Sequence, residues 1–251
     1  MKFPRLFLLS TFCLLPFAGC AKSPSGGATV AAPNRLEVTL TIDKTLDPNF
    51  YYGVAFDDEP GDGDGPRALD SNTVLLNGVM GGSWKVLVLF HQTLSNPIIY
   101  YRSDPDDPGS ERRILGTSLL FSRPRVSSNA INFVLDLDAQ VSSGTYFFDH
   151  TAGVTPTLAT DRFDVNFVTT NRIIVGTGNS GGGSDQRVKP VDAYETASLS
   201  TSFEFQLAST RQISITDALN DKRLDIDPSF ASVNFGQLDV RKLDLSVTRS
   251  R

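Results

Sequence analysis

Apolar and polar residues alternate along much of the chain after residue 35, and this period of two constrains the fold more than any other feature. The alternation is clearest in five segments, at residues 36–42, 131–137, 163–167, 203–207 and 243–247. Such a pattern places one face of a strand on a core and the other in water, which is typical of antiparallel sheets. We therefore predict an all-β protein that folds as an antiparallel β-sandwich.

Residues Val86–Phe90 depart from the alternation because they are all apolar. An uninterrupted apolar run of this length indicates a central strand that is covered on both faces. Further strands are expected at residues 51–56, 98–101 and 114–121, which brings the total to about ten strands. Helical signals are confined to residues 190–196 and 216–221, where a turn or two is expected.

Two long loops interrupt the predicted strands. Residues 57–72 are acidic and rich in glycine, and residues 176–189 are rich in glycine and serine. Either loop could be a domain boundary, but sandwiches of about 200–250 residues often form one domain. Residues 35–251 are therefore predicted to be a single domain. The glycine spacing at 176–181 matches a dinucleotide-binding loop, but that function needs a following helix, which the sequence does not support.

The first twenty residues have the composition of a secretory signal. Lys2 and Arg5 precede an apolar run at residues 6–17, which is shorter than the roughly 20 residues that a spanning helix needs. The segment Phe17-Ala18-Gly19-Cys20 resembles a bacterial lipobox, in which a signal peptidase cleaves before a cysteine that carries lipid. The alternative is an ordinary secretory signal followed by an unrelated cysteine.

The lipobox resemblance implies a domain organisation and a location. Residues 1–19 would be the signal peptide, Cys20 the lipid-bearing residue, and residues 20–34 a flexible tether of roughly 20 Å reach. The lipid would anchor the protein to a membrane of the bacterial cell envelope. Ala21 after the cysteine implies sorting to the outer membrane where the host has two membranes.

The charge and the cysteines limit the chemistry of the processed protein. Its net charge changes from −5 to −7 when Lys2 and Arg5 leave with the signal peptide. An acidic domain is unsuited to nucleic acid, which is bound by a basic face, so no nucleic-acid partner is expected. The chain has two cysteines, Cys13 in the signal peptide and Cys20 at the lipid, so no disulfide is expected in the folded domain.

The acidic loop is the strongest candidate for a metal site. Five carboxylates lie within the eight residues 57–64, and glycines between them allow the chain to wrap around an ion. Oxygen ligands of this kind suit calcium, so calcium is the cofactor that the loop predicts, if it binds one. The predicted ligands are Asp57, Asp58, Asp62 and Asp64. The alternative is an acidic turn that is simply solvated, because the spacing is not that of an EF-hand.

Aromatic side chains could bind a sugar by stacking on its apolar faces. The candidates are Tyr51, Tyr52 and Trp84, because two adjacent tyrosines in a strand point to opposite faces and one of them can be exposed. The segment at residues 49–59 also resembles a strand of carbohydrate-binding sandwiches of the dehydrogenase-associated sensor type. This resemblance implies that the sandwich binds a carbohydrate.

These observations favour binding over catalysis. The chain has two histidines, His91 and His150, and neither lies in a sequence typical of a catalytic triad or a zinc site. The predicted function is a non-catalytic binding or structural module of the cell envelope, with an envelope protein or polysaccharide as partner. The alternatives are a carbohydrate-binding sandwich stabilised by calcium and, less supported, a hydrolase.

Overall fold

The structure is a computed structural model of the chain. It describes residues 34–59, 64–68, 79–92, 96–115, 118–151, 157–158, 161–170, 190–196, 199–200, 202–207, 211–217 and 235–248. Backbone contacts group Ala32–Arg251 into one compact unit, to which all of these residues belong. Cys20 and the loop at residues 176–189 lie outside the described residues.

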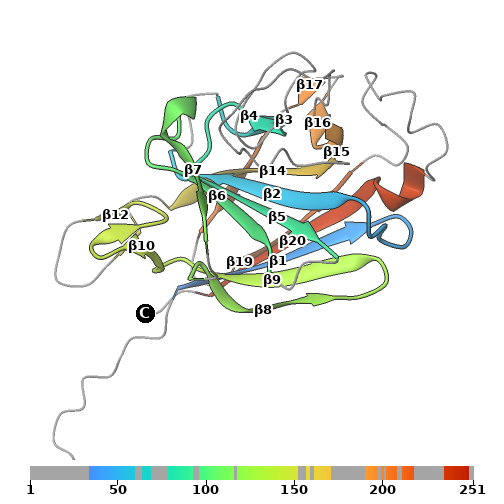
Figure 1. The fold of residues 1–251 in the computed structure, drawn as a ribbon, viewed down its shortest axis with the longest axis horizontal. Coiled ribbons are helices and arrows are strands. Elements are labelled where there is room, and N and C mark those ends of the chain that lie inside the picture. Colours follow the sequence, from blue (N-terminus) through green and yellow to red (C-terminus); the bar gives the residue numbers. More distant parts are fainter. Residues whose placement is uncertain are drawn as a thin grey trace, which may run out of the picture. The chain divides into compact units, whose positions relative to one another are not determined.

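Five strands form the first sheet, and each is antiparallel to its neighbours in the order β19-β20-β1-β9-β8 (Figure 1). They are β1 (Arg35–Ile42), β8 (Leu120–Val126), β9 (Ala130–Asp136), β19 (Arg211–Thr216) and β20 (Val240–Thr248). Buried residues alternate with more exposed ones in β1, β9 and β20, which confirms these predicted strands. The register sets Val38 opposite Phe133 and Leu245, so the apolar residues form rows on one face.

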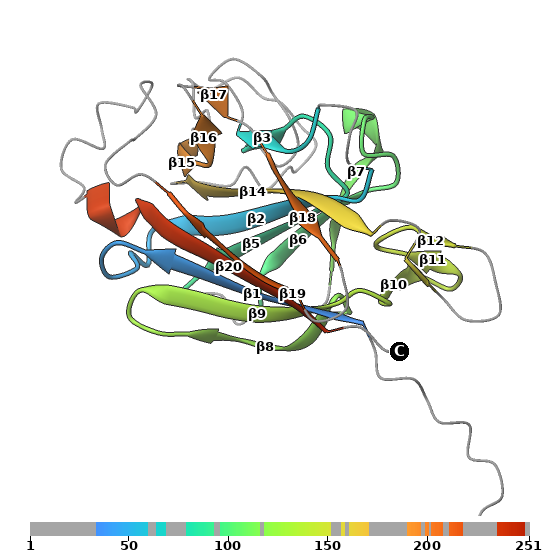
Figure 2. The same cartoon turned by 180° about the vertical axis from the view of Figure 1, so that it is seen from behind.

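Seven strands form the second sheet, in the order β15-β14-β2-β5-β6-β7, with β18 also paired to β14 (Figure 2). They are β2 (Tyr51–Asp57), β5 (Val86–His91), β6 (Ile98–Arg102), β7 (Glu111–Ile114), β14 (Arg162–Thr170), β15 (Pro190–Ala193) and β18 (Phe203–Gln206). These pairs are antiparallel as well. The first part of β14 pairs with β18 and its last part with β15, so two short strands complete that edge.

In the described residues, four small hairpins and two 3₁₀ turns connect the main strands. The hairpins pair β3 (Arg67–Ala68) with β4 (Met80–Gly81), β10 (Gln140–Ser142) with β11 (Thr145–Tyr146), β12 (His150–Thr151) with β13 (Thr157–Leu158), and β16 (Glu195–Thr196) with β17 (Leu199–Ser200). The 3₁₀ turns are η1 (Pro108–Ser110) and η3 (Phe235–Gln237). Within the described part of the chain, no helix has the length and apolar composition needed to cross a bilayer.

The two sheets pack face to face around a shared apolar core. Side chains of the first sheet, such as Leu40 and Leu245, lie in the same cluster as Val54, Phe56 and Phe167 of the second. Each fully buried side chain of this size contributes roughly 1.5–3 kcal/mol to folding. The structure therefore confirms the predicted all-β class and the antiparallel β-sandwich.

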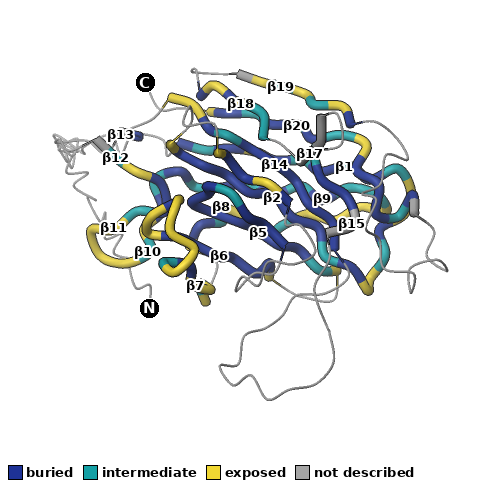
Figure 3. Tube along the Cα trace, turned by 90° about the horizontal axis from the view of Figure 1, so that it is seen from above, coloured by how far each residue is buried: buried dark blue, intermediate teal, exposed yellow. Residues whose placement is uncertain are grey.

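Strand β5 is buried on both faces, as its uninterrupted apolar sequence predicts (Figure 3). Val86, Val88 and Phe90 belong to the core between the sheets, and Leu87 and Leu89 belong to a second cluster on the opposite face. The other buried members of this second cluster are Ala55, Val79, Met80, Trp84, Ile98, Tyr100 and Val168. The outer face of the seven-stranded sheet is thus covered by apolar side chains rather than by water.

A buried ion pair holds this cover in place. Arg102 ends β6 and Glu111 begins β7; both side chains are fully buried, with 3.4 Å between Nη2 and Oε2. The Arg102 Nη1 donates to the carbonyl oxygens of Gly82 at 2.8 Å and Pro105 at 3.0 Å. Its guanidinium also lies 4.0 Å from the centre of the Trp84 ring. Arg102 therefore joins the segment before β5 to the loop before β7.

The structure contradicts the predicted single strand at residues 114–121. Strand β7 ends at Ile114 in the seven-stranded sheet, and β8 begins at Leu120 in the five-stranded sheet. Leu115, just after β7, is 87% exposed. The chain passes from one sheet to the other between these two strands, where the sequence has the turn-type residues Gly116-Thr117-Ser118.

The helical turn predicted at residues 190–196 is also wrong. These residues form β15 and β16, and β15 pairs with the last residues of β14, where Val168 lies opposite Ala193. Pairing with an open sheet edge satisfies backbone groups that a short helix would leave without partners. Of the other expected turn, at 216–221, Thr216 ends β19 and residues 218–221 lie outside the described residues.

We expect Arg102→Ala to lower the free energy of unfolding by about 3–5 kcal/mol, because it leaves the buried Glu111 carboxylate without its cation. Urea denaturation of the full chain, solubilised in detergent, measures this change. Arg162→Ala is the matched control, since the pair of Arg162 with Glu204 is exposed at 44% and 41% and should be worth less than about 1 kcal/mol. Equal losses in the two variants would contradict a structural role for the buried pair.

Candidate functional site

The predicted calcium ligands do not lie together as the sequence suggests. Asp57 and Asp58 are buried at the end of β2 and follow one another, so their side chains leave opposite faces of the strand. Asp64 is exposed and forms an ion pair with Arg67 at 2.8 Å. Asp62 lies outside the described residues. Of the four, Asp58 is the one that the structure brings into a cluster of described carboxylates.

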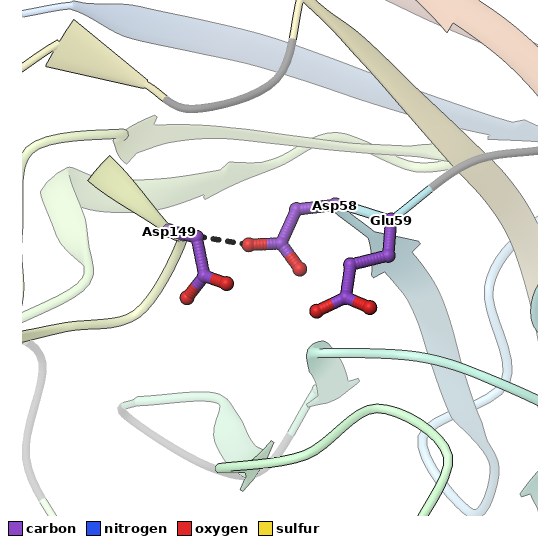
Figure 4. A group of neighbouring side chains, drawn as sticks. All are labelled: Asp58, Glu59 and Asp149. Carbon is purple, nitrogen blue, oxygen red and sulfur yellow. Dashed lines mark hydrogen bonds between the residues drawn. The ribbon is translucent and has the colours of Figure 1, made fainter. Parts of the chain in front are cut away.

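The other members of that cluster are Glu59 and Asp149, neither of which the sequence predicts. One carboxylate oxygen from each of Asp58, Glu59 and Asp149 lies within 4.8 Å of the other two, as Figure 4 shows. Asp58 and Glu59 follow β2, whereas Asp149 precedes β12, about 90 residues further along the chain. We refer to these three residues as the acidic cluster.

Aromatic packing in the core brings the two segments together. Phe56 in β2 and Phe148 are both buried, with 6.5 Å between their ring centres, and Phe148 lies 4.9 Å from Phe163 of β14. Phe56 comes two residues before Asp58, and Phe148 comes directly before Asp149. The packing of these two rings therefore holds Asp58 near Asp149. The backbone N–H of Asp149 then donates to Asp58 Oδ2 at 2.6 Å.

In the described part of the chain, Lys85 is a cation that contacts the acidic cluster. Its side chain is 3% exposed, and its Nζ donates to Asp149 Oδ1 at 2.9 Å and to the carbonyl oxygen of Ser103 at 3.4 Å. Burial alone would lower the pKa of Lys85, but the carboxylates of Asp58 and Asp149 outweigh it and raise that pKa. The ammonium therefore stays charged, and one positive charge faces three carboxylates.

Asp58 is the buried carboxylate of the acidic cluster. It is 3% exposed, and burial raises the pKa of its carboxyl to about 6, although Lys85 and the N–H of Asp149 act in the opposite direction. Its Oδ1 is buried and has no hydrogen-bond partner. In Figure 4 this second oxygen points toward the space between the carboxylates of Glu59 and Asp149.

The predicted sugar-stacking platform is wrong for two of its three residues. Tyr52 is 1% exposed, and its hydroxyl accepts from the N–H of Asp47 at 2.7 Å and donates to the carbonyl oxygen of Gln237 at 2.9 Å. Trp84 is fully buried in the outer cover, where its Nε1 donates to the Met80 carbonyl at 3.3 Å. Neither side chain offers a ring face to a ligand at the surface.

Tyr51 is the one predicted platform residue that reaches solvent in part. Adjacent tyrosines point to opposite faces of β2, as predicted, but the outer cover also packs against Tyr51. Its ring centre lies 4.4 Å from that of His91. The prediction fails for most of the platform because Tyr52 lies in the core between the sheets and Trp84 is part of the outer cover.

Both histidines have structural surroundings. The Nδ1 of His150 lies 2.7 Å from the Phe148 carbonyl oxygen, to which it donates, and its Nε2 lies 3.2 Å from Asp138 Oδ1. The ring also stacks on Tyr146 with 3.9 Å between centres. Burial lowers the pKa of His91, which favours its neutral form beside Tyr51. These contacts give both side chains a role in packing.

Comparisons with known proteins add no relative from which a function could be transferred. No protein-family model, curated protein or solved structure matches the chain.

Ionisation of Asp58 should lower the free energy of unfolding of the wild type as the pH rises from about 4 to about 6. We expect Asp58→Asn to remove this contribution. The pKa of Asp58 is about 6 in the folded protein against an ordinary value of 3.8, so the folded state holds this proton more tightly in that interval. Its contribution to the free energy of unfolding therefore decreases as the pH rises through the interval, and asparagine does not titrate. Urea denaturation at several pH values, without added divalent cations, measures the two slopes.

Asp64→Asn is the control for this experiment, because it removes an exposed carboxylate from the same loop. It should keep the wild-type slope. A wild-type slope in Asp58→Asn would show that the carboxyl of Asp58 ionises as freely in the folded protein as in the unfolded chain, contrary to its burial.

Proposed function

We propose that the protein is a lipid-anchored module of the bacterial cell envelope that binds another envelope protein without catalysing a reaction. The observation that carries this proposal is the segment Phe17-Ala18-Gly19-Cys20 after a short apolar run, with its resemblance to a lipobox. A single lipid chain gives marginal membrane binding, whereas the multiple acyl chains of a bacterial lipoprotein anchor it stably.

The way the folded unit begins supports a tethered role. The backbone N–H of Asn34 donates to Asp138 Oδ2 at 2.9 Å, and its side-chain Nδ2 donates to Asp138 Oδ1 at 3.0 Å. The fold therefore includes Asn34, the last residue of the predicted tether. The chain then enters β1, which is paired along its length with both β9 and β20. A pull on the tether would act on a central strand rather than on a loose end.

The edge strand β8 supports a protein-binding role. The exposed large apolar side chains of the described residues are Leu115, Phe121 and Val126, in or close to this strand. Arg123 and Arg125 are exposed in the same strand of a protein whose net charge is negative. Aromatic residues and arginine are enriched in protein interfaces, and arginine selects an acidic partner. The partner that fits this edge is an envelope protein with an acidic surface.

The surroundings of the histidines favour binding over catalysis. The two histidines pack against Tyr51 and Tyr146, and His150 also binds Asp138 and the Phe148 carbonyl. A catalytic base needs a free nitrogen within reach of its substrate. Sugar binding draws no support from the aromatic residues, since Tyr52 and Trp84 are buried.

We expect Cys20→Ser to move the protein from the membrane fraction to the soluble fraction of the producing bacterium. The substitution removes the thiol that would carry lipid, and an alkyne-labelled fatty acid should no longer be incorporated. Cys13→Ser is the matched control, because it removes the other cysteine of the chain and leaves the lipobox unchanged. Labelling that persists in Cys20→Ser, or is lost equally in Cys13→Ser, would contradict lipid attachment at Cys20.

A further inference from the structure

The acidic cluster contains an oxygen atom whose situation calls for a ligand. Asp58 is only 3% exposed. Its Oδ2 accepts from the N–H of Asp149, and its buried Oδ1 has no hydrogen-bond partner. Buried carboxylate oxygens without partners are rare in folded proteins, because the loss of hydration is not repaid. Figure 4 shows that this oxygen faces the other two carboxylates.

From this arrangement we propose that Asp58, Glu59 and Asp149 bind a divalent cation of the size of calcium. The three ligand atoms lie within 4.8 Å of one another. Two oxygens that bind the same calcium ion at about 2.3–2.6 Å can be no more than about 4.6–5.2 Å apart. Magnesium, at about 2.0–2.1 Å and with near-ideal octahedral geometry, tolerates less spread among its ligands. The three carboxylates are therefore close enough to share one calcium ion after small movements of the exposed Glu59 and Asp149 side chains.

The charge of the site agrees with a divalent ion. Asp58, Glu59 and Asp149 carry three negative charges when ionised, and Lys85 supplies one positive charge. The remaining charge of −2 is neutralised by one divalent cation and only halved by a monovalent one. Lys85 donates to one oxygen of Asp149, Oδ1, at 2.9 Å, so the positive charge lies directly beside the cluster.

The ligand types and their exposure point to the same ion. The cluster offers carboxylate oxygens and no sulfur or imidazole, which suits a hard cation such as calcium rather than zinc or copper. Asp58 is buried, whereas Glu59 is exposed and the Asp149 side chain is 51% exposed. The ion would thus be held from the buried side and reached by water from the other, which lets water complete its coordination.

Cation binding would join two distant parts of the chain. Asp58 and Glu59 extend β2 of the seven-stranded sheet, and Asp149 lies between the β10–β11 hairpin and β12. In the described residues, one hydrogen bond links the three carboxylate residues across the two segments. It runs from the Asp149 N–H to Asp58 Oδ2. An ion would add a second link there. Its binding does not depend on lipid at Cys20.

The test is a calcium titration of the full chain, solubilised in detergent and freed of metal with EGTA. We expect binding with a dissociation constant of roughly 0.1–1 mM, as in extracellular calcium modules. At 10 mM calcium the melting temperature should then rise by about 3–10 °C. Calorimetry and thermal unfolding measure the two quantities, with sodium chloride added to match the ionic strength.

Variants separate a specific site from general charge screening. Glu59→Gln changes an exposed side chain, so the protein should fold normally while its calcium affinity falls at least tenfold. Asp58→Asn should lose the calcium response as well. Asp64→Asn, which removes another carboxylate of the same loop, should respond like the wild type.

Three results would overturn the proposal. The first is a wild-type melting temperature that 10 mM calcium does not change. The second is a calcium response in Glu59→Gln and Asp58→Asn equal to that of the wild type. The third is a response to magnesium at the same concentration as large as that to calcium, which would refute a site of calcium size.

Discussion

Burial of the central strands of the seven-stranded sheet on both faces is the constraint on which the rest of the structure depends. One face of β2 and β5 packs in the sandwich core, and the other lies under Trp84, Met80 and neighbouring side chains. That cover is held by Arg102, whose charge is in turn balanced by Glu111 in the same buried region. Apolar burial and one buried ion pair therefore decide which surfaces of the sheet remain open to ligands.

The same constraint explains why binding chemistry lies at a strand end rather than on a sheet face. Tyr52 is buried in the core between the sheets and Trp84 in the outer cover, which leaves the end of β2 as the place where polar groups gather. There, packing between Phe56 and Phe148 brings Asp58 to Asp149, and the backbone of Asp149 holds one oxygen of Asp58. The core thus places a buried carboxylate beside two exposed ones and leaves one of its oxygens facing them.

Much of the fold follows from local patterns, whereas the candidate site does not. Alternation predicts β1, β9 and β20 because each has one buried face, and the apolar run of β5 predicts its burial on both faces. The break after Ile114 has a local signal, the turn-type residues Gly116-Thr117-Ser118, but the prediction gave more weight to the apolar residues on either side. The link from Asp58 to Asp149 escapes prediction because it depends on which aromatic rings meet in the core. The sequence marks the acidic loop, but only tertiary packing selects its partners.

The most direct test of this account is a crystal structure of the protein with a calcium analogue that scatters anomalously, such as terbium. The account predicts an anomalous peak among Asp58, Glu59 and Asp149, at about 2.3–2.6 Å from Asp58 Oδ1. The Lys85 ammonium should stay bound to Asp149 beside it. A peak only elsewhere on the surface, or the Lys85 ammonium in the space among the three carboxylates, would contradict the account.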